Sequence, residues 1–372
     1  VLATSPDLFV IARNSSFTYK GKAVKVQEVA EQLGVRYVLE GSVQQSGEKL
    51  RVTAQLVDAV DGKHLWAERY DRKLDDLFAM QDEITNKIFY EMHVKLTIGE
   101  RANDWQKHFG DPEGMRLHMK GFDRFLTFTL DGHQDAERIY GELYKKNPEG
   151  GMGNLDMGWI HWQKIVMGLT NDPKQSIKLG REFGEKAHAI MGDGGSLTLL
   201  AWFDLFEQDF ESAIENARRA TEISPSDGNT AAIAGTVYRN SGKSEESAIL
   251  LKRAMRLQPY HPKWYAWQLG ISLLVLEKYD EAEEIFEAVL KSDTEIVSDK
   301  YAALAGLAVI SVFRQNLENA EKYASQLTEL VVYGKKFNIS VLAPIFGLMK
   351  EQEFAKRFLD ALRQLGVPDK SE

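Results

Sequence analysis

The spacing of apolar residues predicts a small mixed domain over residues 1–72. A helical spacing over 24–33 ends at Gly34, and apolar-rich segments follow at 35–44, 50–57 and 64–70. In the middle segment apolar and polar positions alternate, which is typical of a strand with one buried face. The Ser-Gly and Asp-Gly pairs between the segments favour tight turns. We therefore expect a helix and a meander of three strands, preceded by a short buried strand over residues 8–12.

The period then changes to that of a helix. Residues 74–98 place apolar side chains at helical spacing, and the acidic residues Asp71, Asp75 and Asp76 lie near the start, where the helix dipole favours negative charge. Gly110-Asp111-Pro112 in the polar stretch 99–114 indicates a boundary. We expect residues 73–110 to connect two domains.

Beyond this boundary the chain repeats itself. Ala213, Ala220 and Pro225 recur as Ser247, Ala254 and Pro259, each 34 residues later. The same spacing of small, large and proline residues indicates a first unit at about 115–148, and a fifth and a sixth unit after residue 262. The distance between Pro148 and Pro225 requires nine extra residues, which we place at 168–174. A period of this length is typical of paired helices that stack on their neighbours.

This pattern resembles the tetratricopeptide repeat. The resemblance implies a right-handed helical solenoid, with about six helix pairs over 111–335 and capping helices over 336–372. The overall fold class expected is therefore mostly α, with a small α+β domain in front.

The first domain carries a second resemblance. Residues 9–17, 34–43 and 64–72 resemble the TolB-like N-terminal domain, which precedes tetratricopeptide repeats in bacterial class III adenylate and guanylate cyclases and in related regulators. Residues 257–265 and 358–366 resemble the repeats and the C-terminal helix of the same proteins. In that family an earlier strand and helix precede the strand at Phe9, so we expect an N-terminally truncated domain.

Composition excludes several classes of site. The net charge is −9, and nearly all of the excess acid lies after residue 110, so the basic stripe that binds nucleic acid is absent. The chain has no Cys, which excludes disulfides, thiolate zinc sites and a cysteine nucleophile. The His residues are scattered, and the Gly-rich stretches at 150–153 and 192–195 lack a following Gly-Lys-Ser/Thr. We expect no cofactor, no metal and no catalytic constellation, and hence no cyclase activity in this chain.

The concave side of the solenoid is the stronger candidate site. The resemblance places positions 2, 5, 9 and 12 of each first helix on that side, and Trp rings there are good interface anchors. The alternative is that the same rings belong to the core between repeats. The dicarboxylate clamp of chaperone-binding repeats is not matched. The expected groove residues are Trp159, Trp162, Trp202, Asn229, Thr236, Arg239, Trp264 and Trp267.

We therefore expect a non-catalytic regulatory or protein-interaction module, the sensory or partner-recruiting region of a longer signalling protein such as a nucleotide cyclase. One alternative is an enzyme or small-ligand sensor with its site at the junction of the two domains. In that context residues 13–16 are either a turn or a ligand site at the end of a strand. A further alternative is a self-assembling scaffold.

The expected partner is a protein or peptide in the groove, not nucleic acid. The predicted strand at 8–12 lacks a neighbour, so residues 1–72 are expected to form a homodimer. No apolar run is long enough to insert into a membrane. The missing initiator Met indicates a piece of a longer bacterial protein, held outside the cytoplasm by a membrane-bound region or located in the cytoplasm.

Overall fold

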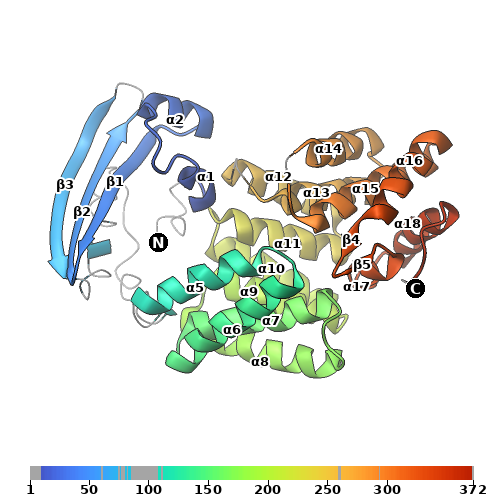
Figure 1. Ribbon diagram of the computed structural model, residues 1–372, viewed down its shortest axis with the longest axis horizontal. Coiled ribbons are helices and arrows are strands. Elements are labelled where there is room, and N and C mark those ends of the chain that lie inside the picture. Colours follow the sequence, from blue (N-terminus) through green and yellow to red (C-terminus); the bar gives the residue numbers. More distant parts are fainter. Residues whose placement is uncertain are drawn as a thin grey trace.

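The computed structural model describes residues 10–59, 62–73, 76, 80–81, 83–84, 108–109, 112–258, 261–292 and 294–370. Within these ranges helices dominate, and a small antiparallel sheet lies at the N-terminal end of the chain (Figure 1). The fold class expected from the sequence, a mostly helical solenoid preceded by a small α+β unit, is confirmed.

The sheet is the predicted meander. Helix α2 (Val26–Leu33) ends at Gly34, which adopts the left-handed conformation with φ of 65°. Strands β1 (Tyr37–Ser46), β2 (Lys49–Asp58) and β3 (Lys63–Lys73) then pair antiparallel in chain order. The alternating apolar residues of β2 are buried together with Trp66 and Tyr70, so one face of the sheet forms a core of its own.

The strand predicted over residues 8–12 is wrong for Val10–Ala12. These residues form no strand, and the next five make the short helix α1 (Arg13–Phe17). The backbone N–H of Ala12 donates to the carbonyl of Leu257, at 3.1 Å, so this segment bonds to the solenoid and not to the sheet. Leu8 and Phe9 lie outside the described residues.

Most of the helix expected over 74–98 also lies outside the described residues. Met80 and Ile84 are helical, and both pack on the buried face of the sheet. Met80 and Ile84 thus shield from water the apolar face of the sheet, which a single-layer sheet would expose.

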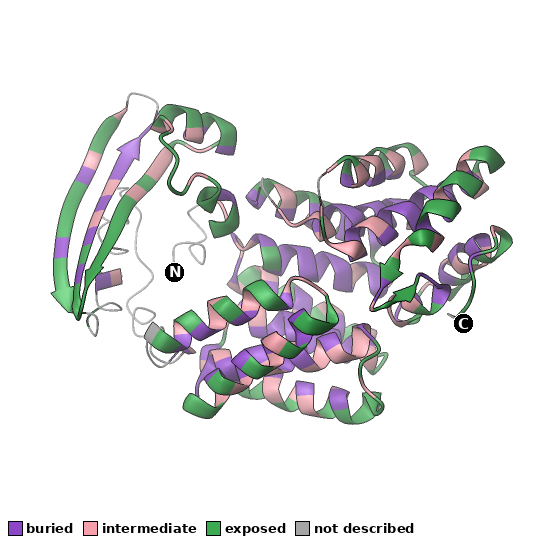
Figure 2. Cartoon of the chain, viewed as in Figure 1, coloured by how far each residue is buried: buried purple, intermediate pink, exposed green. Residues whose placement is uncertain are grey.

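Residues 112–329 form six helix pairs. Their helices are α5 (Pro112–Phe125) and α6 (Leu130–Lys146), α7 (Gly151–Val166) and α8 (Pro173–Met191), α9 (Gly194–Phe206) and α10 (Phe210–Ile223), α11 (Gly228–Asn240) and α12 (Ser244–Leu257), α13 (Lys263–Val275) and α14 (Tyr279–Lys291), and α15 (Val297–Phe313) and α16 (Leu317–Glu329). Figure 2 shows that the first helices from α9 onward are buried along most of their length, whereas the second helices present exposed faces.

The second pair contains the expected extra residues. Helix α7 begins at residue 151 and α9 at residue 194, which is nine residues more than the period of 34. The connection over 167–172 is longer than its counterparts, and α8 has 19 residues where α10 has 14. Asp172 caps α8 by accepting from the Gln175 N–H, and Pro173 occupies its first position. Helix α7 is also longer, with 16 residues where α9 has 13, so the insertion is spread over the predicted loop and both helices of the pair.

Glycines allow the helix pairs to approach closely. The ring of Phe286 lies between Gly270 and Gly306, and a Cβ atom added at either glycine would come within 2.6 Å or 2.5 Å of that ring. Phe286 itself is fully buried. The Phe286 ring of α14 thus fills the space that the absence of side chains at Gly270 on α13 and Gly306 on α15 leaves between the helices. Such filling is typical of close-packed protein interiors.

The chain ends in a segment that does not continue the repeat. It consists of the hairpin β4 (Val331–Val332) and β5 (Lys335–Lys336), the 3-10 turn η3 (Ile339–Val341), the short helix α17 (Ala343–Phe346) and the amphipathic helix α18 (Gln352–Gln364). Helix α18 packs against α15. None of the helices in the described residues is both long and apolar enough to cross a bilayer.

Candidate functional site

The first helices of the six pairs line one continuous hollow, which we call the aromatic groove. Its volume is about 420 Å³. Its aromatic residues are Phe122, Phe125, Phe128, Tyr140, Trp159, Trp162, Trp202, Trp264, Trp267, Tyr301 and Tyr333. Its polar residues are His118, Asp156, Thr198, Asp227, Asn229, Thr230, Thr236, Gln268, Ser298 and Asp299. The groove is therefore walled by rings and carries a few polar groups, a composition typical of a ligand site.

Helical spacing explains why the tryptophans meet. Trp159 and Trp162 are three residues apart on α7, and Trp264 and Trp267 are three apart on α13. Side chains at this spacing project from one face of a helix. Because both helices are first members of their pairs, both tryptophan pairs point into the same hollow.

Trp162 is the centre of a cluster of rings. Its ring centroid lies 5.4 Å from that of Trp159 and 5.4 Å from that of Trp202, at interplanar angles of 80° and 63°. Phe128 lies 6.1 Å away at 86°, and Phe125 lies 6.3 Å away. Edge-to-face packing of this kind is favourable between aromatic rings. Trp159 and Trp162 are only partly buried, whereas Trp202 is 6% exposed.

One end of the groove carries a buried acid–base pair. His118 Nδ1 lies 2.8 Å from Asp156 Oδ2, and Asp156 is buried. Burial alone would lower the pKa of the His118 imidazole, but the neighbouring Asp156 carboxylate outweighs it and raises that pKa. The two groups therefore form a pair whose charges compensate each other.

The other end carries Asp299, which is 2% exposed. Its Oδ1 accepts from Trp267 Nε1 at 3.0 Å, and its Oδ2 accepts from Thr294 Oγ1 at 2.9 Å. Burial raises the pKa of the Asp299 carboxyl, and these hydrogen bonds oppose the rise. Between the two ends, Asp227 caps α11 by accepting from the Asn229 N–H at 2.9 Å.

The structure brings most of the predicted groove residues together. The members that line the aromatic groove are Trp159, Trp162, Trp202, Asn229, Thr236, Trp264 and Trp267. Asn229 is exposed and Trp264 is half-buried, whereas Thr236 is fully buried and donates to the Ala232 carbonyl of its own helix. Trp267 is 8% exposed, so it is also part of the core around α13.

Arg239 is the predicted groove residue that does not line the aromatic groove. It is fully buried and lines a second, enclosed cavity of about 20 Å³, beneath the C-terminal segment. Its guanidinium donates to Gln268 Oε1. Burial lowers the pKa of Arg239 to about 10 despite the nearby Glu351. The repeat register puts Arg239 on the concave side as expected, but the C-terminal segment covers it there.

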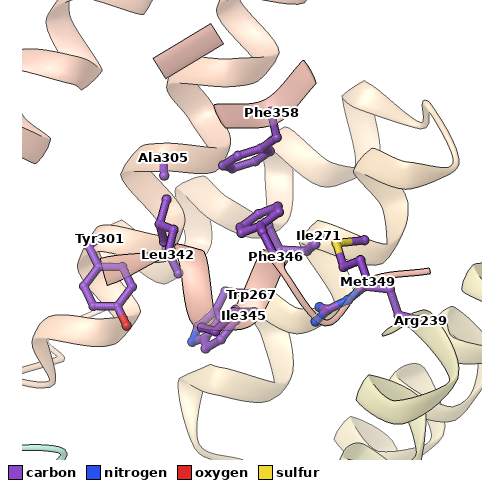
Figure 3. Close-up of a pocket in the computed structure, with 11 residues that line it drawn as sticks. Arg239, Trp267, Ile271, Tyr301, Ala305, Leu342, Ile345, Phe346, Met349 and Phe358 are labelled. Carbon is purple, nitrogen blue, oxygen red and sulfur yellow. The ribbon is translucent and has the colours of Figure 1, made fainter. Parts of the chain in front are cut away.

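Residues 338–351, which we call the C-terminal strap, lie in the stretch expected as capping helices, but they form only η3 and the short helix α17, and the sequence did not predict that they fold back onto the concave side. Figure 3 shows Leu342, Ile345, Phe346 and Met349 around the enclosed cavity with Trp267 and Ile271. Farther along, the Lys350 N–H donates to the Asn240 carbonyl at 2.7 Å, and Leu348 joins the core beside Trp202. The strap thus fills the concave side next to α11, α13 and α15, and the aromatic groove is the part that remains open.

Known proteins share parts of this arrangement. A tetratricopeptide repeat profile matches residues 268–330. Putative adenylate cyclase 3 of Rhizobium meliloti (strain 1021) is 42% identical over 164 residues, which are 44% of this chain and 27% of that relative. The matched stretch thus spans about a quarter of the relative's length.

Two solved bacterial structures are among those with a similar helix arrangement. PilF of Pseudomonas aeruginosa has a TM-score of 0.40 and 13% identity over 59% of this chain and 94% of its own. A thermophilic tetratricopeptide repeat protein of Thermus thermophilus has a TM-score of 0.42 and 16% identity over 52% of this chain and 98% of its own.

Among the residues that the structure describes, no group of three or more His, Asp or Glu side chains has the geometry of a metal site.

Proposed function

We propose that this chain is a non-catalytic regulatory module that binds a protein or peptide in the aromatic groove and belongs to a longer signalling protein such as a nucleotide cyclase. The repeat profile and the relative named as a putative adenylate cyclase support this proposal. We further propose that residues 1–72 are a TolB-like domain and 73–110 a connection. In this proposal residues 111–335 form the tetratricopeptide-like helix pairs, and residues 336–372 form the C-terminal capping helices.

The observation that carries the proposal is the convergence of tryptophans. Five of the seven Trp residues of the chain line one groove, contributed by α7, α9 and α13. Large rigid rings lose little entropy when a partner docks, and they are enriched among residues that dominate binding. A volume of about 420 Å³ lies in the range of specific ligand pockets, roughly 300–1,000 Å³.

A displayed library of random peptides, selected against the whole chain, tests the proposal. Enriched sequences should bind the wild-type chain and lose about 5- to 30-fold in affinity for Trp264→Leu, because an anchoring ring contributes roughly 1–2 kcal/mol. Trp66→Phe is the matched control, since Trp66 is buried in the sheet and not in the groove. A library without enriched sequences, or enriched sequences that bind both chains equally, would contradict the proposal.

We also propose that a second copy of this chain pairs with residues 1–72. Among the described strands, β1 lies at an edge of the sheet, and its Leu39 and Val43 are 44% and 67% exposed. An edge strand with free backbone groups and exposed apolar side chains is a template for another strand. Pairing of two β1 strands about a two-fold axis would produce a symmetric dimer.

A further inference from the structure

Acidic side chains outnumber basic ones in the lining of the aromatic groove. Its lining contains Asp156, Asp227 and Asp299, and the described part of that lining includes no Lys or Arg. His118 compensates Asp156, which leaves Asp227 and Asp299 as negative groups without a counter-charge in the lining. On the basis of the function proposed above, we propose that the groove binds a positively charged organic group, an alkylammonium or a guanidinium carried on an apolar body.

The carboxylate of Asp299 supplies the first argument. It is almost completely buried, and its hydrogen bonds come from neutral donors, Trp267 and Thr294. Lys263 lies within electrostatic range and favours the charged form of Asp299, but the hydrogen bonds that the described residues donate to this carboxylate are from neutral groups. A buried carboxylate is costly without a cationic partner. A cation in the groove would provide that partner.

The tryptophan rings supply the second argument. A cation is attracted to the face of an aromatic ring when it lies within about 6 Å of the centroid, and Trp is the most favourable ring. Trp159, Trp162 and Trp202 all line the groove, and Trp159 and Trp162 are only partly buried. Aromatic walls also favour the apolar body of such a ligand over a hydrated inorganic ion.

An unused donor defines a further property of the ligand. Trp162 Nε1 is buried, and no acceptor among the described residues bonds to it. An unpaired buried N–H destabilises the free protein, and a ligand acceptor would satisfy it. We therefore expect the ligand to carry a hydroxyl or carbonyl oxygen near its cationic group. Both a peptide with an Arg or Lys side chain and a small amino alcohol have this chemistry.

Calorimetric titration of the whole chain with two matched pairs of probes tests the proposal. Choline is compared with its uncharged isostere 3,3-dimethylbutan-1-ol, and the peptide acetyl-Ala-Leu-Arg-Leu-Ala-amide with the same peptide containing citrulline. In each pair the shape is kept and the charge removed. We expect the charged probe of at least one pair to bind about 5- to 30-fold more tightly than its neutral counterpart.

The carboxylates are tested with charge-removing variants. Asp299→Asn should weaken the charged probe by about 5- to 10-fold and leave the neutral probe unchanged, because the side chain keeps its shape and loses its charge. Asp227→Asn is the second variant if the first does not fold, since Asn is an equally good cap for α11. Asp209→Asn is the control, because Asp209 caps α10 in the same way and does not line the groove.

The outcomes separate the two proposals. A preference for the Arg peptide alone identifies a peptide side chain as the ligand, and a preference for choline alone identifies a small molecule. Neutral probes that bind as tightly as the charged ones, or an absence of binding by both charged probes, would overturn the inference. If the peptide library yields enriched sequences in that case, the partner-binding function stands and only the charge selectivity is wrong.

Discussion

Replacement of Trp267 and of Trp264 by Ala should separate a core ring from a binding ring. The two residues lie on the same face of α13 and both line the aromatic groove. Trp267 is 8% exposed and its Nε1 donates to the buried Asp299, whereas Trp264 is half-buried. The same chemical change therefore removes very different interactions at the two positions.

The magnitudes follow from burial and hydrogen bonding. Removal of a buried Trp side chain costs about 3–5 kcal/mol in free energy of unfolding. At Trp267 the change also deprives the Asp299 carboxylate of a donor, which adds about 1–3 kcal/mol. At Trp264 only about half of the ring leaves a packed environment, so we expect a cost of about 2 kcal/mol. Trp267→Ala should thus be at least twice as destabilising as Trp264→Ala.

Urea unfolding followed by far-ultraviolet circular dichroism measures both costs. The wild type and both variants are compared at the same protein concentration, and the slopes of the transitions are checked for equality before the midpoints are converted to free energies. Equal destabilisation by the two variants, or a larger effect of Trp264→Ala, would refute the assignment of Trp267 to the core.

The remaining predictions concern packing, association and pH. Gly306→Ala should lower the free energy of unfolding by about 1–3 kcal/mol because its Cβ meets the ring of Phe286, whereas Gly141→Ala, with open space around it, should raise it by about 0.5–1 kcal/mol in the same urea assay. Val43→Lys should convert the proposed dimer to a monomer in light scattering, and a wild-type chain that is monomeric at about 50 μM would contradict dimer formation. Affinity for choline should fall as the pH is lowered, because burial raises the pKa of Asp299 and protonation removes its charge, and Asp299→Asn should lose that part of the dependence in calorimetry.

Local patterns were sufficient to predict the repeating part of the chain. The spacing between Ala213 and Ser247 gave the period, and the structure places Gly194 and Gly228, the first residues of α9 and α11, at the same separation. The same register placed the tryptophans on the first helices. Each of these predictions depends on contacts between neighbouring repeats, which a periodic sequence encodes directly.

Contacts between distant segments could not be predicted in this way. Residues 338–351 belong to the stretch expected as capping helices, but nothing in the spacing of their apolar residues indicates that they lie beside α11 and α13. Arg239 was therefore expected in the groove, whereas this segment covers it. The apolar run at Val10–Ala12 has the composition of a strand, and short runs of this kind do not distinguish a strand from other buried backbone. Its hydrogen bond to Leu257 depends on how two remote parts of the chain meet.

The C-terminal strap changes how this solenoid is expected to fold. In an open array of repeats each unit interacts only with its neighbours, so the ends fray and folding can start anywhere and spread. Here the C-terminal strap is coupled to the third and fourth helix pairs. Lys350 forms a hydrogen bond with Asn240, and Leu348 is buried beside Trp202. Contacts between residues so far apart in sequence slow folding, because a long loop must close before they form. The final repeats should therefore melt together with the middle of the array, in a single cooperative transition.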